Sequence, residues 1–111
     1  MEITFASKKL QKRFSTDSGL RAEYGARMAK IIKRRLADLA DADSLDEMRI
    51  LPGRCHELKE NLAGHLAVDL EHPYRLIFVP SDHPRPTKPD GGLDWGKVTR
   101  IAIVDVIDYH R

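Results

Sequence analysis

The residues best suited to chemistry in this sequence are basic and aromatic side chains placed on segments that are otherwise apolar. His56 and Lys59 fall on one strand-like segment, and Arg75 falls inside another, within Tyr-Arg-Leu-Ile-Phe-Val. The last apolar segment ends in three more polar residues, which are Asp108, Tyr109 and His110. Arginine and histidine are uncommon inside strands of an apolar sheet unless a partner or a function keeps them there. These positions are therefore the candidate site.

Such a set of side chains suits the cleavage of RNA without a metal ion. The reaction must remove the proton of a ribose 2′-OH, neutralise the adjacent phosphate and protonate the 5′-oxygen that leaves. Histidine can act as acid or base because its pKa lies near neutrality. Lysine and arginine can hold the phosphate oxygens and stabilise the charge that grows in the transition state. Tyr109 can stack on a base or orient the phosphate.

Each of these residues also has a purely structural interpretation. A histidine on a strand is often a satisfied structural residue, and Arg75 taken alone could be the partner of a carboxylate in an ion pair. Tyr109 and His110 could be the frayed, solvated end of the chain. Residue types and spacing leave both interpretations open.

Other kinds of site are not indicated. The five histidines lack the paired spacing of metal ligands, and the sequence has no phosphate-binding loop, dinucleotide fingerprint or nucleophile elbow. We therefore expect no metal and no cofactor. The single cysteine, Cys55, suits a reducing cytosol and is expected to be buried in a strand. No stretch approaches the roughly 18 apolar residues of a membrane span, and the N-terminus lacks a signal-peptide run, which predicts a cytoplasmic protein without membrane contact.

The N-terminal half predicts one short strand followed by two helices. Residues 2–5 alternate in polarity as a strand does, and Ser7 can cap a first helix. A longer helix is predicted from about 17 to 40, because apolar side chains recur there at helical spacing: Leu20, Tyr24, Met28, Ile32, Leu36 and Leu39. Its basic side chains fall mostly off that stripe, so its outer surface should be positively charged. A short capped turn of helix is predicted at 44–48.

The C-terminal half changes to the period of two that marks strands. Strands are predicted over residues 54–59, 65–70, 74–79 and 97–108, with Arg75 pointing away from the apolar face of its strand. Residues 80–96 hold four prolines and three glycines and predict a loop that is long for so small a fold. Because the last strand is apolar on both faces, it should lie in the middle of the sheet.

These elements predict an α+β fold in which two N-terminal helices pack on one face of a small, mostly antiparallel sheet. The length suits a single domain spanning residues 1–111. The net charge of +2 conceals an asymmetry, since residues 1–35 carry a net +7 and residues 36–71 a net −6. The basic third could meet a polyanion or an acidic partner protein, or it could be a solvated helix face.

Four segments resemble, in order, the HigB-type toxins of the RelE/ParE superfamily. They are Leu-Pro-Gly-Arg-Cys-His-Glu-Leu-Lys at 51–59, Ala-Gly-His-Leu-Ala-Val at 63–68, Tyr-Arg-Leu-Ile-Phe at 74–78 and Val-Ile-Asp-Tyr-His at 106–110. In that family a turn leads into a His-x-Leu-Lys strand, which is followed by a Gly-x-(Trp)-x-(Val/Ile) segment, an aromatic-Arg pair and a final Asp-Tyr-His. The resemblance covers about residues 45–79 and 97–110.

The resemblance implies the microbial RelE fold and a toxin of a type II toxin–antitoxin system that cuts mRNA in the ribosomal A site. It also implies that His56 and Lys59 contact or activate the scissile phosphate and that Arg75 stabilises the transition state. The site would be completed by Asp108, Tyr109 and His110. In this scheme His110 acts as general acid or base. The implied partner is a HigA-like antitoxin with a helix-turn-helix, so that operator DNA is bound only through the complex.

Three departures from the family pattern keep a second interpretation open. Glu-Asn-Leu follows Lys59 where the family usually has Gly-Asp-Arg, His65-Leu66 stands at a place that is often aromatic, and the 80–96 loop exceeds the usual hairpin. The alternative is a non-catalytic binder with the same fold, either a gyrase-directed ParE-like toxin or a partner within the operon. The retained basic residues favour the nuclease, since a binder does not require them.

Overall fold

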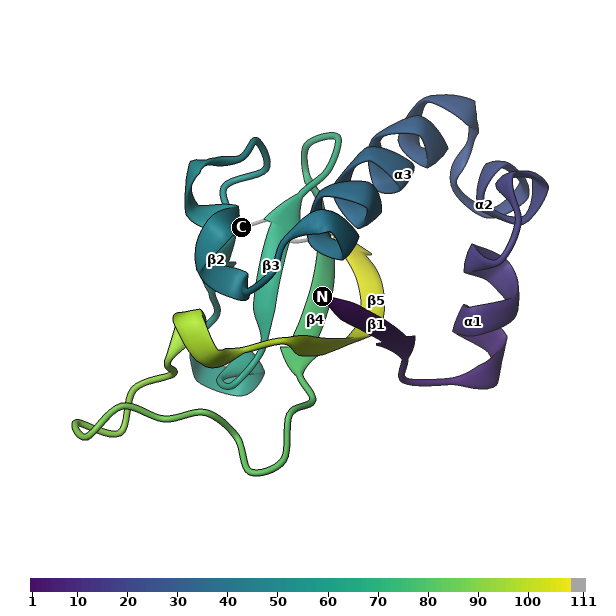
Figure 1. Ribbon diagram of the computed structural model, residues 1–111. Coiled ribbons are helices and arrows are strands. Elements are labelled where there is room, and N and C mark those ends of the chain that lie inside the picture. The colour runs from purple at the N-terminus through teal and green to yellow at the C-terminus, as the bar shows by residue number, and fades with distance from the viewer. Residues whose placement is uncertain (109–111) are drawn as a thin grey trace.

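The computed structural model describes residues 1–108, which form one five-stranded sheet with helices packed against it (Figure 1). The strands are β1 Glu2–Phe5, β2 His56–Glu57, β3 Leu66–Asp69, β4 Tyr74–Pro80 and β5 Arg100–Asp108. Their order in the sheet is β1-β5-β4-β3-β2. Only the β1–β5 pairing is parallel among these strands, and the other three pairings are antiparallel. The predicted α+β fold with a mostly antiparallel sheet is confirmed.

Three α-helices follow β1, namely α1 Lys8–Phe14, α2 Asp17–Tyr24 and α3 Ala26–Asp41. Short 3-10 helices lie later in the chain, namely η1 Leu45–Ile50, η2 Glu60–Leu62 and η3 Trp95–Lys97. Ser7 caps α1 as predicted, because its hydroxyl accepts a hydrogen bond from the Leu10 amide at 3.1 Å. Thr16 caps α2 in the same way through the amide of Gly19 at 2.9 Å.

The prediction of one helix from 17 to 40 is wrong, because the chain breaks at Gly25 into α2 and α3. Gly25 has φ +87°, a conformation that is open to glycine and unfavourable for other residues. Its N–H still donates to Arg21 O at 2.9 Å, and its carbonyl accepts from the Ala29 amide at 3.0 Å. One residue thus ends one helix and begins the next. The apolar spacing continues across the break, which explains why the pattern did not reveal it.

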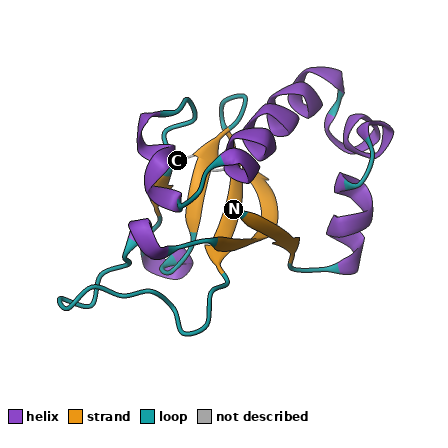
Figure 2. Ribbon diagram, viewed as in Figure 1, coloured by secondary structure: helices purple, strands orange, loops and turns teal. Residues whose placement is uncertain are grey.

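The main apolar core lies between the helices and one face of the sheet, with α3 crossing that face in the ribbon view (Figure 2). Most of the predicted helical stripe is buried there, and Tyr24 and Leu36 are half-buried at its edge. The sheet contributes alternate residues of its strands, namely Leu66, Val68, Leu76, Phe78, Ile101 and Ile103. The opposite face of the sheet carries a smaller apolar cluster, around Ala67 and Ile77.

The strand predicted over 54–59 is shorter than expected. Only His56 and Glu57 pair with β3, because Arg54 and Glu60 have φ +50° and +59° and turn the chain on either side. The strand predicted over 65–70 is present as β3. Because β2 is short, the segment that carries His56 and Lys59 is held mainly by the turns on either side and less by strand pairing.

The last strand occupies the predicted place inside the sheet, since β5 pairs with β1 on one side and with β4 on the other. It begins at Arg100, three residues later than predicted, and η3 ends at Lys97, where the strand was expected to start. The loop predicted over 80–96 is present and swings away from the sheet at the lower left of Figure 1. Leu93 and Trp95 are buried where it returns, so the end of the loop is anchored to the core.

Candidate functional site

The face of the sheet opposite the helices brings together residues from three strands. His56 of β2 pairs with Ala67 of β3, and Ala67 pairs with Ile77 of β4. Two residues along each strand, Asp69 pairs with Arg75. Side chains two positions apart on a strand share a face. His56, Asp69 and Arg75 therefore project from the same face, above the buried Ala67 and Ile77.

A cavity of about 290 Å³ opens on this face. Its walls are Arg54, His56, Glu57, Leu58, Lys59 and Arg75. Three of the predicted site residues, His56, Lys59 and Arg75, thus lie around one space. Two guanidinium groups and an ammonium group around an imidazole make the cavity attractive to an anion. The carboxylate of Glu57 accepts a hydrogen bond from the indole of Trp95 at 3.0 Å.

The ring of His56 is held by the backbone of the preceding turn. Its Nδ1 lies 2.6 Å from the carbonyl oxygen of Arg54. Because a carbonyl oxygen only accepts hydrogen bonds, Nδ1 carries the proton in this arrangement, and Nε2 has the lone pair of the neutral ring. The half-buried imidazole can therefore accept a proton at Nε2, as a general base must.

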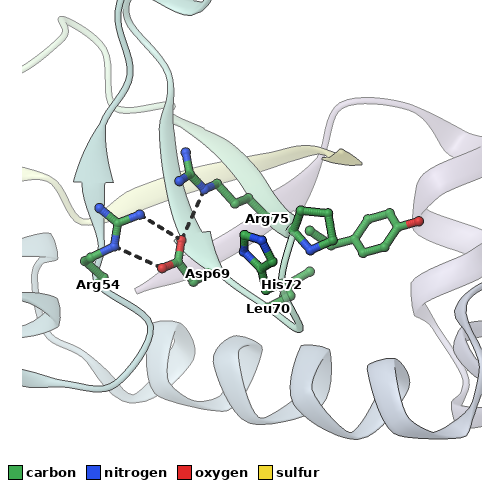
Figure 3. Close-up of a pocket in the computed structure, with 7 residues that line it drawn as sticks. Arg54, Asp69, Leu70, His72 and Arg75 are labelled. Atoms are coloured by element: carbon green, nitrogen blue, oxygen red, sulfur yellow. Dashed lines mark hydrogen bonds and ion pairs between the residues drawn. The ribbon is translucent and has the colours of Figure 1, made fainter. Parts of the chain in front are cut away.

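One carboxylate joins the two arginines of the cavity (Figure 3). Arg54 Nε lies 3.0 Å from Asp69 Oδ2, and its Nη2 lies 3.4 Å from Oδ1. Arg75 Nε lies 3.2 Å from Oδ1 of the same group. The side chain of Arg54 is 61% exposed and that of Arg75 is 20% exposed, so the Arg75 pair is the more sheltered from water.

A second cavity, of about 250 Å³, also has the two arginines in its wall. It lies at the turn between β3 and β4, and Asp69, Leu70, His72, Pro73 and Tyr74 complete its lining. Tyr74 is 40% exposed, although it lies on the same face of its strand as the buried Leu76 and Phe78. At the end of the strand its ring is partly exposed and contributes to the lining of this second cavity.

Arg54 and Asp69 are members of the site that the sequence interpretation missed. Arg54 lies in a Pro-Gly-Arg turn, where a basic residue is unremarkable. The signal for Asp69 was present in the sequence, since residues 69 and 75 flank a short hairpin turn. Hairpin pairing places such residues directly opposite each other, and an acidic residue facing Arg75 is then expected to form an ion pair. Arg75 thus forms an ion pair with a carboxylate, as its structural interpretation predicted, and also lines the candidate site.

The C-terminal part of the predicted site is described only as far as Asp108. This residue ends β5, is exposed and pairs with Tyr74, while Arg75 pairs with the neighbouring Ile107. Because paired residues project from the same face of a sheet, the side chain of Asp108 lies on the face of Tyr74, opposite to the face that carries Arg75. Tyr109 and His110 lie outside the described residues.

Cys55 lies just before β2 and not in a strand as predicted. Burial raises the pKa of its thiol to about 12, an effect that nearby Arg49 opposes and Glu57 assists. The thiol is therefore protonated at neutral pH and is a poor nucleophile. Within residues 1–108, no three His, Cys, Asp or Glu side chains are grouped so that they could hold a metal ion. No helix in this described part is long and apolar enough to cross a membrane.

The chain belongs to the class of small α+β folds in which helices cover one face of a mostly antiparallel sheet. Solved structures with a similar fold include the YoeB–YefM complex from Staphylococcus aureus, which is 19% identical with a TM-score of 0.58 and aligns over 100% of this chain and 98% of that one. The YoeB/ParE toxin from Agrobacterium tumefaciens is 12% identical with a TM-score of 0.61, over 99% and 100% of the two chains. The YoeB dimer from Staphylococcus aureus is 20% identical with a TM-score of 0.57, over 100% and 98%.

This protein therefore has the fold of the YoeB and YoeB/ParE toxins, and the expected RelE-like fold is confirmed. No protein-family model matches the sequence, and the search of curated proteins finds no match either. The HigB subtype stays a prediction from the sequence.

Proposed function

We propose that this protein is the toxin of a type II toxin–antitoxin system and that it cleaves mRNA on the ribosome, in the cytoplasm, without a metal ion. The observation that carries the proposal is the cavity around which His56, Lys59 and Arg75 lie. The fold shared with the YoeB toxins supports it. The ordered resemblance of four segments to HigB-type toxins supports it independently of the fold.

The proposed reaction starts at the ribose on the 5′ side of the scissile phosphate. His56 Nε2 takes the 2′-OH proton, the 2′-oxygen bonds to phosphorus, and the bond from phosphorus to the 5′-oxygen breaks. The products are a 2′,3′-cyclic phosphate and a 5′-hydroxyl. Lys59 and Arg75 bind the non-bridging oxygens as their charge grows. His110 is the proposed acid that gives the 5′-oxygen its proton. The resemblance to HigB-type toxins adds Asp108 and Tyr109 to the proposed site.

The decisive experiment compares two strand arginines. Wild-type protein should arrest growth when its expression is induced, and it should cut mRNA only in the presence of translating ribosomes. Arg75→Ala should lower the cleavage rate by about 10²–10³-fold while the protein stays folded. Arg100→Ala is the matched control, because Arg100 Nε also lies 3.2 Å from a carboxylate, that of Glu2, away from both cavities. Normal growth with folded wild-type protein would refute the proposal.

The proposed partner is a HigA-like antitoxin with a helix-turn-helix, so that operator DNA is bound only by the complex. The staphylococcal neighbour was solved as a complex with YefM, which supports an antitoxin partner in general. Co-expression with the product of an adjacent helix-turn-helix gene should restore growth, and the two proteins should copurify. Failure of every neighbouring gene product to restore growth would count against this partner.

A gyrase-directed toxin, or a non-catalytic partner within the operon, is the second candidate. The ion pairs of Asp69 with both arginines favour it, because the carboxylate offsets part of the positive charge of the cavity. The Agrobacterium neighbour is described as a YoeB/ParE toxin, and this description fits a nuclease and a gyrase-directed toxin equally. A supercoiling assay with purified gyrase separates the candidates. Inhibition of gyrase without mRNA cleavage would select the second.

A further inference from the structure

The backbone of Asp69 is fixed on both sides. Its N–H donates to the carbonyl oxygen of Gly53 at 2.7 Å, and its own carbonyl accepts from Arg35 Nε of α3 at 2.8 Å. Gly53 has φ +107°, and a Cβ at this position would lie 2.7 Å from Arg35 Nε. The glycine therefore allows Arg35 to approach, and the Asp69 carboxylate projects from a backbone that cannot easily shift.

Arg54 reaches this carboxylate from an unusual backbone conformation. A φ of +50° is uncommon for a residue with a side chain, and such positions persist where the surroundings hold them. The guanidinium contacts both Asp69 oxygens, while the carbonyl of Arg54 holds His56 Nδ1 at 2.6 Å. One residue thus connects the carboxylate to the imidazole of the candidate site.

Asp69 lies between the two guanidinium groups in Figure 3, and the terminal nitrogens of Arg75 turn away from the carboxylate. Two guanidinium groups repel each other, and a long arginine side chain as exposed as that of Arg54 would otherwise sample many rotamers. A carboxylate between them removes the repulsion and fixes both before any ligand arrives. The two arginines are shared by both cavities.

We propose that Arg54 is a second phosphate-binding guanidinium for the RNA backbone and that Asp69 is the positioning residue that holds it and Arg75. This inference rests on the proposed function of the site. It carries a specific consequence, because the same carboxylate that orients the arginines also repels an incoming phosphate. Removing its charge should therefore strengthen the binding of RNA in the ground state and reduce the stabilisation of the transition state.

The experiment measures binding and cleavage separately in Asp69→Asn. The binding probe is a short single-stranded RNA with 2′-O-methyl riboses, which cannot supply the attacking hydroxyl. Loss of one charge about 6 Å from a phosphate in water should tighten its binding about threefold. Loss of orientation should lower kcat for ribosome-dependent cleavage roughly 10–100-fold. Asp69→Glu restores the charge and should return RNA affinity to the wild-type value, with part of kcat.

The matched control is Asp17→Asn. Asp17 also joins two cations, Arg21 and Lys33, on the helical side of the molecule, and its replacement changes the net charge by the same amount. It should leave kcat unchanged, and any change in RNA affinity reports the effect of net charge alone. Arg54→Ala should weaken RNA binding severalfold while its backbone carbonyl still holds His56.

The outcomes separate this inference from the proposed function. Tighter RNA binding with slower cleavage in Asp69→Asn supports the positioning role, because a purely structural residue would not improve binding. Wild-type binding and cleavage in Asp69→Asn or in Arg54→Ala overturn the inference and leave the nuclease intact. Wild-type protein that cuts no mRNA overturns the proposed function, and the binding measurements then decide alone whether Arg54 and Asp69 act on a phosphate.

Discussion

Replacing Trp95 by phenylalanine should loosen the short strand that carries His56. Trp95 is only 6% exposed, and its indole N–H donates to the Glu57 carboxylate at 3.0 Å. Since β2 consists of His56 and Glu57 alone, this bond links the end of the 80–96 loop directly to the strand. The 80–96 loop would then stabilise the position of β2 in the wall of the cavity.

The expected magnitude follows from what phenylalanine keeps and what it loses. The guanidinium carbon of Arg49 lies 4.0 Å from the centre of the Trp95 ring, and a phenyl ring retains a weaker form of this contact. The lost hydrogen bond involves a charged acceptor that water can reach, so about 1–1.5 kcal/mol is expected from it. The smaller ring leaves space in a buried position, which brings the total loss to about 2 kcal/mol.

Amide hydrogen exchange measures where that loss is felt. The Leu58 amide donates to His65 O at 2.9 Å and closes the turn between β2 and β3. Its exchange should become about 10–30-fold faster in Trp95→Phe. Leu58 should exchange through a local opening with a smaller free energy than the opening of β4 and β5, whose amides report the free energy of unfolding that urea denaturation measures. The effects of Trp95→Phe and Glu57→Ala should not add, because both remove the same bond.

One result would refute this reasoning. If urea denaturation shows the expected loss of stability while Leu58 exchanges only through global unfolding, with the same opening free energy as the amides of β4 and β5, Trp95 stabilises the core generally. The loop would then have no particular connection with β2, and the position of His56 would depend on the turn at Arg54 alone.

Three further predictions concern the fold. The pKa of Asp82 lies below its ordinary value: burial alone would raise it, but hydrogen bonds from Thr99 Oγ1 and from the amides of Arg100 and Thr99 outweigh this. The stability that Asp82 contributes is therefore present above the unfolded pKa and is lost as pH falls through the folded pKa. Asp82→Ala should lower the free energy of unfolding by about 2 kcal/mol at pH 7. In urea denaturation at a series of pH values, the variant should lose less stability than the wild type as pH falls. Gly25→Ala meets no neighbouring atoms and should cost about 1–2 kcal/mol from its φ of +87° alone, with an unchanged melting temperature arguing against that strain. Phe78→Ala should cost about 3–5 kcal/mol in urea denaturation, because the side chain is fully buried, and a smaller loss would mean that the core can collapse around it.

Local patterns in the sequence were enough to predict the layers of this fold. The period of the helical stripe and the alternation in β3 each decide which face of one element is buried, and both depend on residues close together in the chain. The break at Gly25 escaped this reasoning because the stripe runs through it unchanged. The strand at 54–59 was predicted too long, since nothing in the side chains of Arg54 or Glu60 indicates a positive φ.

The arrangement of the site depends on pairings that local patterns do not determine. His56 and Arg75 line one cavity only because β3 lies between their strands in one register. That register is set by the turn between Asp69 and Tyr74, which joins β3 to β4. A shift of one residue would turn Arg75 toward the core and the buried Leu76 toward water, so burial of the apolar face enforces the pairing. The stability of the sheet and the position of Arg75 opposite Asp69 therefore have the same physical origin, whereas Arg54 reaches the same carboxylate from the turn before β2.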